Sequence, residues 1–100
     1  MERRDNIKVM VMQNYKKLER VVKGFSNHRR IQIMDLLYKK PELSVFDISD
    51  LLKINFKTAS EHIRRLAIAG LVLKRSDGSS VRHKLSDHGK SILMFLRTLE

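Results

Sequence analysis

The sequence predicts a mainly α-helical domain with one small β-hairpin, in the order α-α-α-α-β-β-α. Apolar residues recur at three- and four-residue steps over most of the chain, which is the helical period. Alternation with a period of two, typical of strands, is confined to residues 71–85. The length of 100 residues allows a single small core. We therefore expect one domain over residues 1–100.

The first predicted helix covers residues 5–23. Four consecutive apolar residues stand at 9–12, and one side of a helix cannot bury all four. This excess of apolar surface in a small domain favours a partner helix from a second copy. We assign residues 1–24 to dimerisation, with Ile7, Met10, Val11, Tyr15 and Leu18 at the interface.

Two helices follow. Ser26 or Asn27 caps the second predicted helix, which ends near Tyr38 because Pro41 disfavours helical geometry before it. Ser44 and Asp47 have the spacing of a capping box and begin a third helix that ends near Leu52. The side chains expected to point inward are Ile31, Met34, Leu37 and Tyr38 on the second helix and Val45, Ile48 and Leu51 on the third.

The fourth predicted helix begins after Asn55, a good N-cap, and ends at Gly70, which suits a left-handed terminus. Its narrow apolar seam consists of Ala59, Ile63, Leu66 and Ala67, and its opposite face of Lys57, Ser60, Glu61, Arg64 and Arg65. Two short helices joined by a tight turn form a helix-turn-helix, here residues 44–69.

The hairpin is predicted over residues 71–85, with strands at 71–75 and 81–85 and a turn at Asp77-Gly78. Val81, His83 and Leu85 share its inward face, so we interpret His83 as a hydrogen-bonded core residue. Ser86 then caps a last helix, assigned to dimerisation over residues 86–99. Its expected interface residues are Ile92, Phe95, Leu96 and Leu99.

The charge of the chain is concentrated. The net charge is +10, and residues 53–84 alone contain eight Lys or Arg against two Asp or Glu. Clustered positive charge on a helix and a hairpin favours nucleic acid over an acidic protein or a membrane. The alternative is an ordinary solvated helix surface.

The sequence lacks the residues and motifs that several classes of function require. The chain has no cysteine, hence no disulfide, no thiolate metal site and no thiol nucleophile. It also has no glycine-rich phosphate loop and no serine-based catalytic constellation, so we expect no enzyme. No apolar run is long enough to cross a bilayer and no signal peptide is visible, which predicts a cytoplasmic protein.

Three stretches are characteristic: Arg29-Arg30-Ile31 followed by Met34 and Leu37, the run ELSVFDI at 42–48, and the run at 60–72. With them, residues 25–90 resemble the winged helix-turn-helix repressors of the arsenic-repressor (ArsR) type. The run at 60–72 is the most specific. The resemblance implies a homodimer joined through its first and last helices, with recognition helices in successive major grooves and the hairpins, or wings, on the flanking DNA backbone.

The resemblance also implies residue roles. The base-reading positions carried over are Phe56, Lys57, Thr58, Ser60 and Glu61. The expected contacts to the DNA backbone are His62, Arg64, Arg65, Lys74, Arg75, Arg82 and Lys84. For His62, packing within the protein is an equal alternative.

The metal ligands of the family are missing. Where thiolate sensors have Cys-x-Cys, this chain has Ser44 and Phe46, neither of which binds a soft metal. Another class uses Asp-x-His on the last helix, but Asp87 and His88 are adjacent here and point about 100° apart. We therefore expect no metal and no cofactor.

The sequence thus predicts a sequence-specific regulator of transcription that binds double-stranded DNA, a homodimeric repressor that blocks a palindromic operator. Two alternatives remain open. A non-specific architectural protein would bind all DNA through phosphate contacts alone. A winged-helix adaptor would bind a protein and retain that binding without its basic residues.

Overall fold

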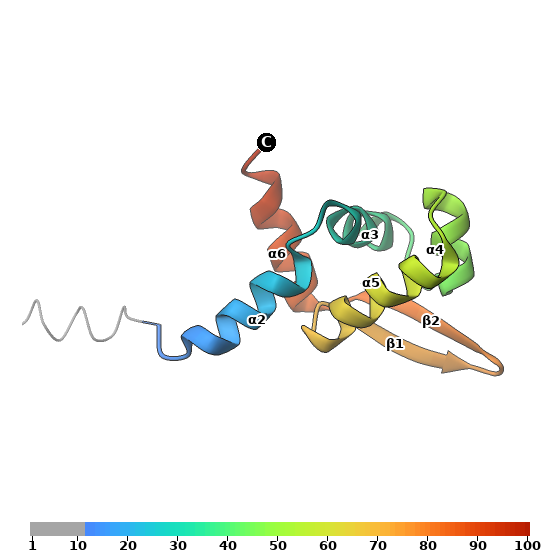
Figure 1. Cartoon of the computed structure of the whole chain (residues 1–100), viewed down its shortest axis with the longest axis horizontal. Coiled ribbons are helices and arrows are strands. Elements are labelled where there is room, and N and C mark those ends of the chain that lie inside the picture. The colour runs from blue at the N-terminus through green and yellow to red at the C-terminus, as the bar shows by residue number, and fades with distance from the viewer. Residues whose placement is uncertain (1–11) are drawn as a thin grey trace, which may run out of the picture.

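The computed structural model describes residues 12–100 and has the predicted order of elements over them (Figure 1). The elements are α2 (Tyr15–Phe25), α3 (His28–Lys39), α4 (Val45–Leu52), α5 (Phe56–Ile68), β1 (Val72–Asp77), β2 (Ser80–Leu85) and α6 (Asp87–Arg97). No helix among these is long and apolar enough to cross a membrane.

The predicted helix starts are confirmed by their hydrogen bonds. Asn27, Asn55 and Ser86 each accept a backbone N–H from the first turn of the helix that follows. At α4 the capping box is complete, since Ser44 Oγ accepts from Asp47 N at 3.1 Å and Asp47 Oδ2 accepts from Ser44 N at 3.0 Å. These bonds connect near neighbours in sequence, so sequence pattern alone located them.

The prediction of one continuous first helix over residues 5–23 was wrong. Residues 12–14 are not helical, and α2 begins at Tyr15 because Asn14 acts as its N-cap and accepts from Lys17 N at 2.9 Å. The remainder of that predicted helix, with Ile7, Met10 and Val11, lies outside the described residues.

The core is formed between α3, α4, α5, the base of the hairpin and α6. Its fully buried members are Ile33, Met34, Leu37, Ile48, Ile63, Leu66, Leu71 and His83. The predicted seam of α5 is confirmed for Ala59, Ile63 and Leu66, which are at most 1% exposed, while its fourth member, Ala67, is half-buried. This leaves the opposite face of α5 in solvent.

Two residues predicted to be inward are exposed instead. Tyr38 follows Leu37 by one position, which turns it about 100° away from the core, and Arg97 lies over its ring at 5.2 Å from the centroid. On α4 the core line passes through Val45, Ile48 and Leu52, and Leu51 stands beside it with 45% of its surface exposed.

The strands β1 and β2 pair antiparallel from Val72 opposite Leu85 to Asp77 opposite Ser80. Both strands extend further toward the tip than predicted, and the turn is Gly78-Ser79. Val81, predicted inward, is 41% exposed because the hairpin projects past the core.

His83 is confirmed as a buried, hydrogen-bonded residue of the core. Its backbone N–H and its ring Nδ1 both bond to the carbonyl oxygen of Leu43, at 2.9 and 2.8 Å. A carbonyl oxygen only accepts, so Nδ1 bears the proton. Burial lowers the pKa of His83, which keeps the ring neutral and ties the base of the hairpin to the segment before α4.

Candidate nucleic-acid interface

The outward face of α5 is polar and begins at a capped helix terminus. Asn55 Oδ1 accepts from the backbone N–H of Lys57 at 2.8 Å and of Thr58 at 3.3 Å. Phe56, Lys57 and Thr58 are exposed, and Ser60 is half-buried. The first turn of α5 therefore presents a phenyl ring, an ammonium group and hydroxyl groups to a ligand outside the protein.

One turn further along α5, Glu61 holds two arginines. Its carboxylate accepts from Arg64 Nε at 3.0 Å and Nη2 at 2.8 Å, and from Arg65 Nε at 3.3 Å. The hydrogen bonds from Arg64, and then those from Arg65, lower the pKa of Glu61 to about 2. Glu61 is therefore ionised at neutral pH, and its carboxylate already binds two arginines of the same helix.

His62 lies at the flank of α5 and is half-buried. Burial lowers its pKa, and the positive charge of Arg30 on α3 acts in the same direction. The imidazole is therefore mostly neutral near pH 7. In that form it offers one donor and one acceptor in place of a full charge.

In the wing, formed by β1 and β2, the two arginines are paired with acids. Arg75 Nε lies 3.4 Å from Glu42 Oε1, and Arg82 lies 3.7 Å from Asp47 Oδ2 and 3.5 Å from Asp77 Oδ2. Arg82 Nη1 also donates to the backbone carbonyl of Glu42 at 3.4 Å. Lys74 and Lys84 are exposed and make no ion pair within residues 12–100.

Sequence reasoning missed Glu42 as an anchor of the wing. Glu42 has a left-handed backbone, with φ of 67°, and its N–H donates to the carbonyl of His83 at 2.8 Å. Its carboxylate and its carbonyl oxygen are thus available to the two wing arginines. Nothing local in the sequence indicated this, because the partners are 33 and 40 residues apart.

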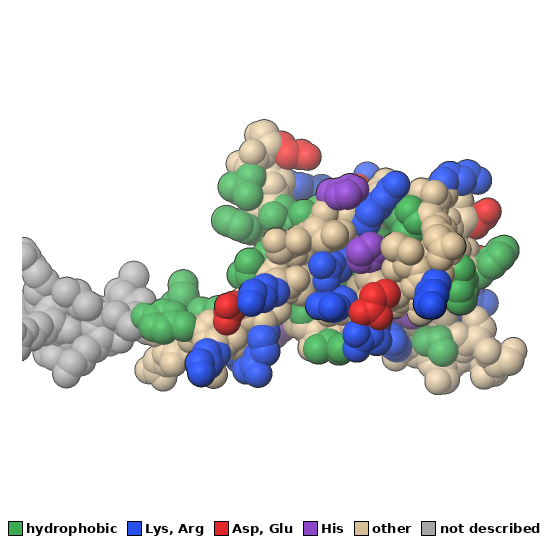
Figure 2. Space-filling model, viewed as in Figure 1, with side chains coloured by type: hydrophobic (Ala, Val, Ile, Leu, Met, Phe, Trp, Pro, Cys, Tyr) green, Lys and Arg blue, Asp and Glu red, His purple; other side chains and the backbone are tan. Residues whose placement is uncertain are grey.

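Many of the basic side chains gather on one face of the molecule. Figure 2 shows Lys and Arg side chains gathered over α2 and α5 on one face, with Asp, Glu and His side chains among them. The wing follows α5 directly and packs against it along β1. The structure therefore brings the predicted base-reading and backbone-contacting positions to neighbouring elements.

The apolar residues predicted for the interface have a separate location, on α2 and α6. Tyr15, Leu18, Phe95 and Leu99 are 41–67% exposed, whereas Ile92 and Leu96 are half-buried. Large apolar side chains exposed on α2 and on α6 are typical of surface that another protein chain covers.

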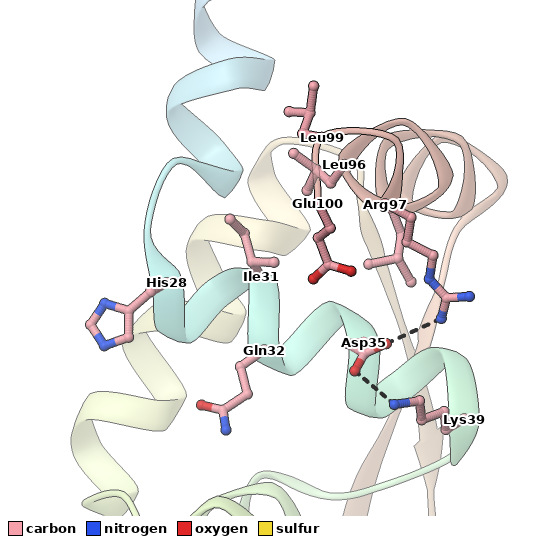
Figure 3. A pocket seen from close by; sticks show the side chains of 10 residues that line it. His28, Ile31, Gln32, Asp35, Lys39, Leu96, Arg97, Leu99 and Glu100 are labelled. Atoms are coloured by element: carbon pink, nitrogen blue, oxygen red, sulfur yellow. Dashed lines mark hydrogen bonds and ion pairs between the residues drawn. The ribbon is translucent and has the colours of Figure 1, made fainter.

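A pocket between α3 and α6 does not extend this basic surface (Figure 3). Asp35 accepts there from Lys39 Nζ at 2.9 Å and from Arg97 Nη2 at 3.3 Å, and these bonds, that of Lys39 first, lower the pKa of Asp35. The charged groups at its floor are therefore satisfied by one another.

The positions of the family's metal ligands have other roles here. Ser44 Oγ is engaged in the capping box, and Phe46 is 67% exposed. Asp87 and His88 lie in the exposed first turn of α6. Over residues 12–100 no three His, Asp or Glu side chains are grouped as metal ligands would be.

Comparison with known proteins agrees with this geometry. Residues 27–74 match the family described as "Bacterial regulatory protein, arsR family". The chain is 31% identical to a cadmium resistance transcriptional regulatory protein, the CadC homologue of Staphylococcus aureus, over 86% of this chain and 72% of that protein.

Among solved structures, the chain is similar to the transcriptional regulator HlyU from Vibrio vulnificus. The two are 33% identical, with a TM-score of 0.74, over 94% of this chain and 97% of that one. It is also similar to a homodimeric winged helix-turn-helix DNA-binding domain from Mycobacterium bovis. There the identity is 28% and the TM-score 0.76, over 83% and 77% of the two chains.

Proposed function

This chain belongs to the arsR family of bacterial regulatory proteins, and we propose that it is a homodimeric repressor of a roughly palindromic operator. As a member of that family it is a DNA-binding regulator of transcription with a winged helix-turn-helix fold. The observation that supports the finer proposal is the exposed polar first turn of α5 beside a basic wing. A helix of this kind fits the major groove, and the wing fits the flanking backbone.

In this proposal the first half of α5 reads bases. Lys57 donates to the acceptors of a guanine, Thr58 and Ser60 form hydrogen bonds with base edges, and Phe56 packs against a thymine methyl group. Glu61 is the fifth predicted reader. Its carboxylate already accepts three hydrogen bonds from Arg64 and Arg65, so a cytosine amine has to share the carboxylate oxygens with these arginines.

Contacts to the DNA backbone supply affinity without sequence information. Lys74 and Lys84 are the wing residues best suited to phosphates, since neither has an acidic partner among residues 12–100. Arg75 and Arg82 contribute less as phosphate ligands because they bind Glu42, Asp47 and Asp77. On α5, Arg64 and Arg65 also bind phosphates, and their shared partner Glu61 weakens these contacts.

The homodimer is supported by the exposed apolar side chains of α2 and α6, and the similar domain from Mycobacterium bovis is itself homodimeric. A two-fold axis through such an interface places two copies of α5 in major grooves about 10 bp, or a multiple of that, apart. A dimer seated on a promoter excludes polymerase sterically, which is the proposed mode of repression.

A soft metal is not the proposed signal. The similar protein from Staphylococcus aureus is described by its role in cadmium resistance, but this chain has no cysteine for a thiolate site. The residues present at the corresponding positions are a helix cap, Ser44, and an exposed ring, Phe46.

Selection from a randomised duplex pool at two salt concentrations tests the proposal. We expect a palindromic motif with half-sites one helical turn, or several turns, apart. Enrichment of no motif, together with steep salt dependence, would make the protein architectural. Absence of binding at low salt would leave the protein-adaptor alternative.

A further inference from the structure

Helix α2 has two chemically different faces. Lys16, Arg20 and Lys23 recur at steps of four and three residues, so they lie along one side of the helix. Leu18 and Val22 stand on the other side and are 41% and 51% exposed. The apolar side is part of the proposed dimer interface, and the basic side has no role so far.

The basic side of α2 adjoins the end of α5 because of Gly24. A Cβ atom placed on Gly24 would overlap Ala69 Cβ and contact the carbonyl oxygen of Arg65. Glycine therefore lets the end of α2 approach the C-terminal end of α5 more closely than any other residue would. This approach places α2 cations beside Arg65.

Between the two helices lies an open groove of about 560 Å³, which has room for a phosphate group and its water. Its lining residues are Lys17, Arg20, Val21, Lys23, Gly24, Arg65, Ile68 and Ala69. Four of them are cations and none is an acid. Lys23 is paired with Glu19 at 3.2 Å and Arg65 with Glu61, while Lys17 and Arg20 make no ion pair within the described part of the chain.

We propose that this groove binds the phosphate backbone of DNA at the centre of the operator, between the two half-sites. The proposal rests on the proposed function. Two observations support DNA as the anion. Lys and Arg side chains lie over both α2 and α5 on one face of the molecule (Figure 2), and the groove shares Arg65 with the outward face of α5.

The central position follows from the arrangement of the elements. In space, helix α2 and the wing tip lie at opposite ends of the described part of the molecule (Figure 1). The apolar side of α2 faces the proposed two-fold axis, so the groove lies near that axis and the wing far from it. Lys17 and Arg20 of both protomers therefore meet the backbone at the middle of the operator.

The test compares two double variants that lose the same charge. Lys17→Gln with Arg20→Gln removes the two groove cations without an ion pair. Lys40→Gln with Lys90→Gln removes two exposed cations that lie outside the groove, α5 and the wing and make no ion pair within residues 12–100. Light scattering first confirms that both variants keep the oligomeric state of the parent protein.

Binding is then measured against salt concentration, on the operator and on a random-sequence duplex. We expect the groove variant to lose about tenfold or more in affinity on both duplexes at 0.15 M salt. Its slope of log K against log salt should fall by about two, and the control should stay near the parent. Equal slopes for the two variants would overturn the groove assignment and leave the proposed function intact, whereas absence of DNA binding by the parent would overturn both.

DNA with uncharged phosphate analogues at chosen positions tests where the groove contacts the backbone. Methylphosphonate linkages at the operator centre should lower the affinity of the parent protein for DNA and leave that of the groove variant unchanged. If the groove variant loses as much affinity as the parent, the contact lies elsewhere. A thermal shift of the parent with inorganic phosphate, combined with an unchanged DNA salt slope in the groove variant, would assign the groove to a free anion instead.

Discussion

The recognition helix α5 and the wing both present arginines, but they hold them differently. On α5, Arg64 and Arg65 share Glu61, which lies three and four residues before them. In the wing, Arg75 and Arg82 reach Glu42 and Asp47 on other parts of the fold. The α5 pairs are local and reduce the positive charge of the outward face of α5. The wing pairs instead fix the position of the hairpin.

In the wing, this difference gives the arginines the role of positioning the hairpin and leaves the lysines to bind DNA. Ion pairs as exposed as these contribute little to stability by themselves, typically about 0–1 kcal/mol each. Their location matters more, because they join the hairpin to Glu42, between α3 and α4, and to Asp47 in the first turn of α4. Lys74 and Lys84 lie on opposite faces of the hairpin, and both remain available to a ligand.

The largest effect is expected from the wing lysines. Lys74→Gln with Lys84→Gln should lower affinity for every duplex about a hundredfold, since each charge-assisted phosphate contact is worth about tenfold. The salt slope should fall by about two. Arg75→Gln with Arg82→Gln removes the same charge but should lower the slope less. Filter binding over a salt series measures both, and equal falls would contradict the separation of roles in the wing.

A smaller effect, on sequence preference, is expected from Lys57. Lys57→Ala should reduce discrimination at one base pair of each half-site by about tenfold, within the usual 1–3 kcal/mol for such a contact. Lys53→Ala, in the turn before α5, is the control. Repeated selection from the randomised pool gives the preferred bases for each variant. A motif unchanged by Lys57→Ala would place base reading elsewhere.

Removing the shared carboxylate of α5 should strengthen binding. Glu61→Gln frees Arg64 and Arg65, so affinity for a random duplex should rise about fivefold, with a steeper salt slope. Asp35→Asn is a matched control, because Asp35 also holds two cations but lies in the α3–α6 pocket. If the two variants behave alike on DNA, Glu61 does not restrain the arginines.

The smallest effect concerns pH. The folded-state pKa of His83 lies below the ordinary value of 6.5, so the unfolded chain takes up the proton first as pH falls. The free energy of unfolding should therefore be level above about pH 7 and decline below 6.5. The pKa of His62 is shifted in the same direction, so His62→Gln serves as the background for the comparison.

On that background His83→Phe should flatten the decline between pH 7.5 and 5.5 in urea titrations. The Glu61 pairs act in a different window. Their contribution to stability is lost only as pH falls from 4.5 toward about 2. A decline that survives His83→Phe unchanged would exclude the wing base as its source.

The sequence by itself determined what depends on near neighbours. Asn27, Ser44, Asn55 and Ser86 bond within three residues along the chain, so spacing alone identified the starts of α3, α4, α5 and α6. The buried seam of α5 followed from the helical period. Its exposed face followed from the same period, so the candidate recognition surface was predictable. The functional roles of its residues stay predictions.

Only the tertiary structure decided what depends on partners far apart in sequence. The inward assignments of Tyr38 and Leu51 failed because the core covers only the neighbouring line of each helix, and that of Val81 failed because the hairpin extends past the core. The pairing of the wing arginines with Glu42, and the close approach of Gly24 to Ala69, join residues 33 to 45 positions apart. Local spacing contains no information about such contacts, because the folded core alone sets which distant side chains meet.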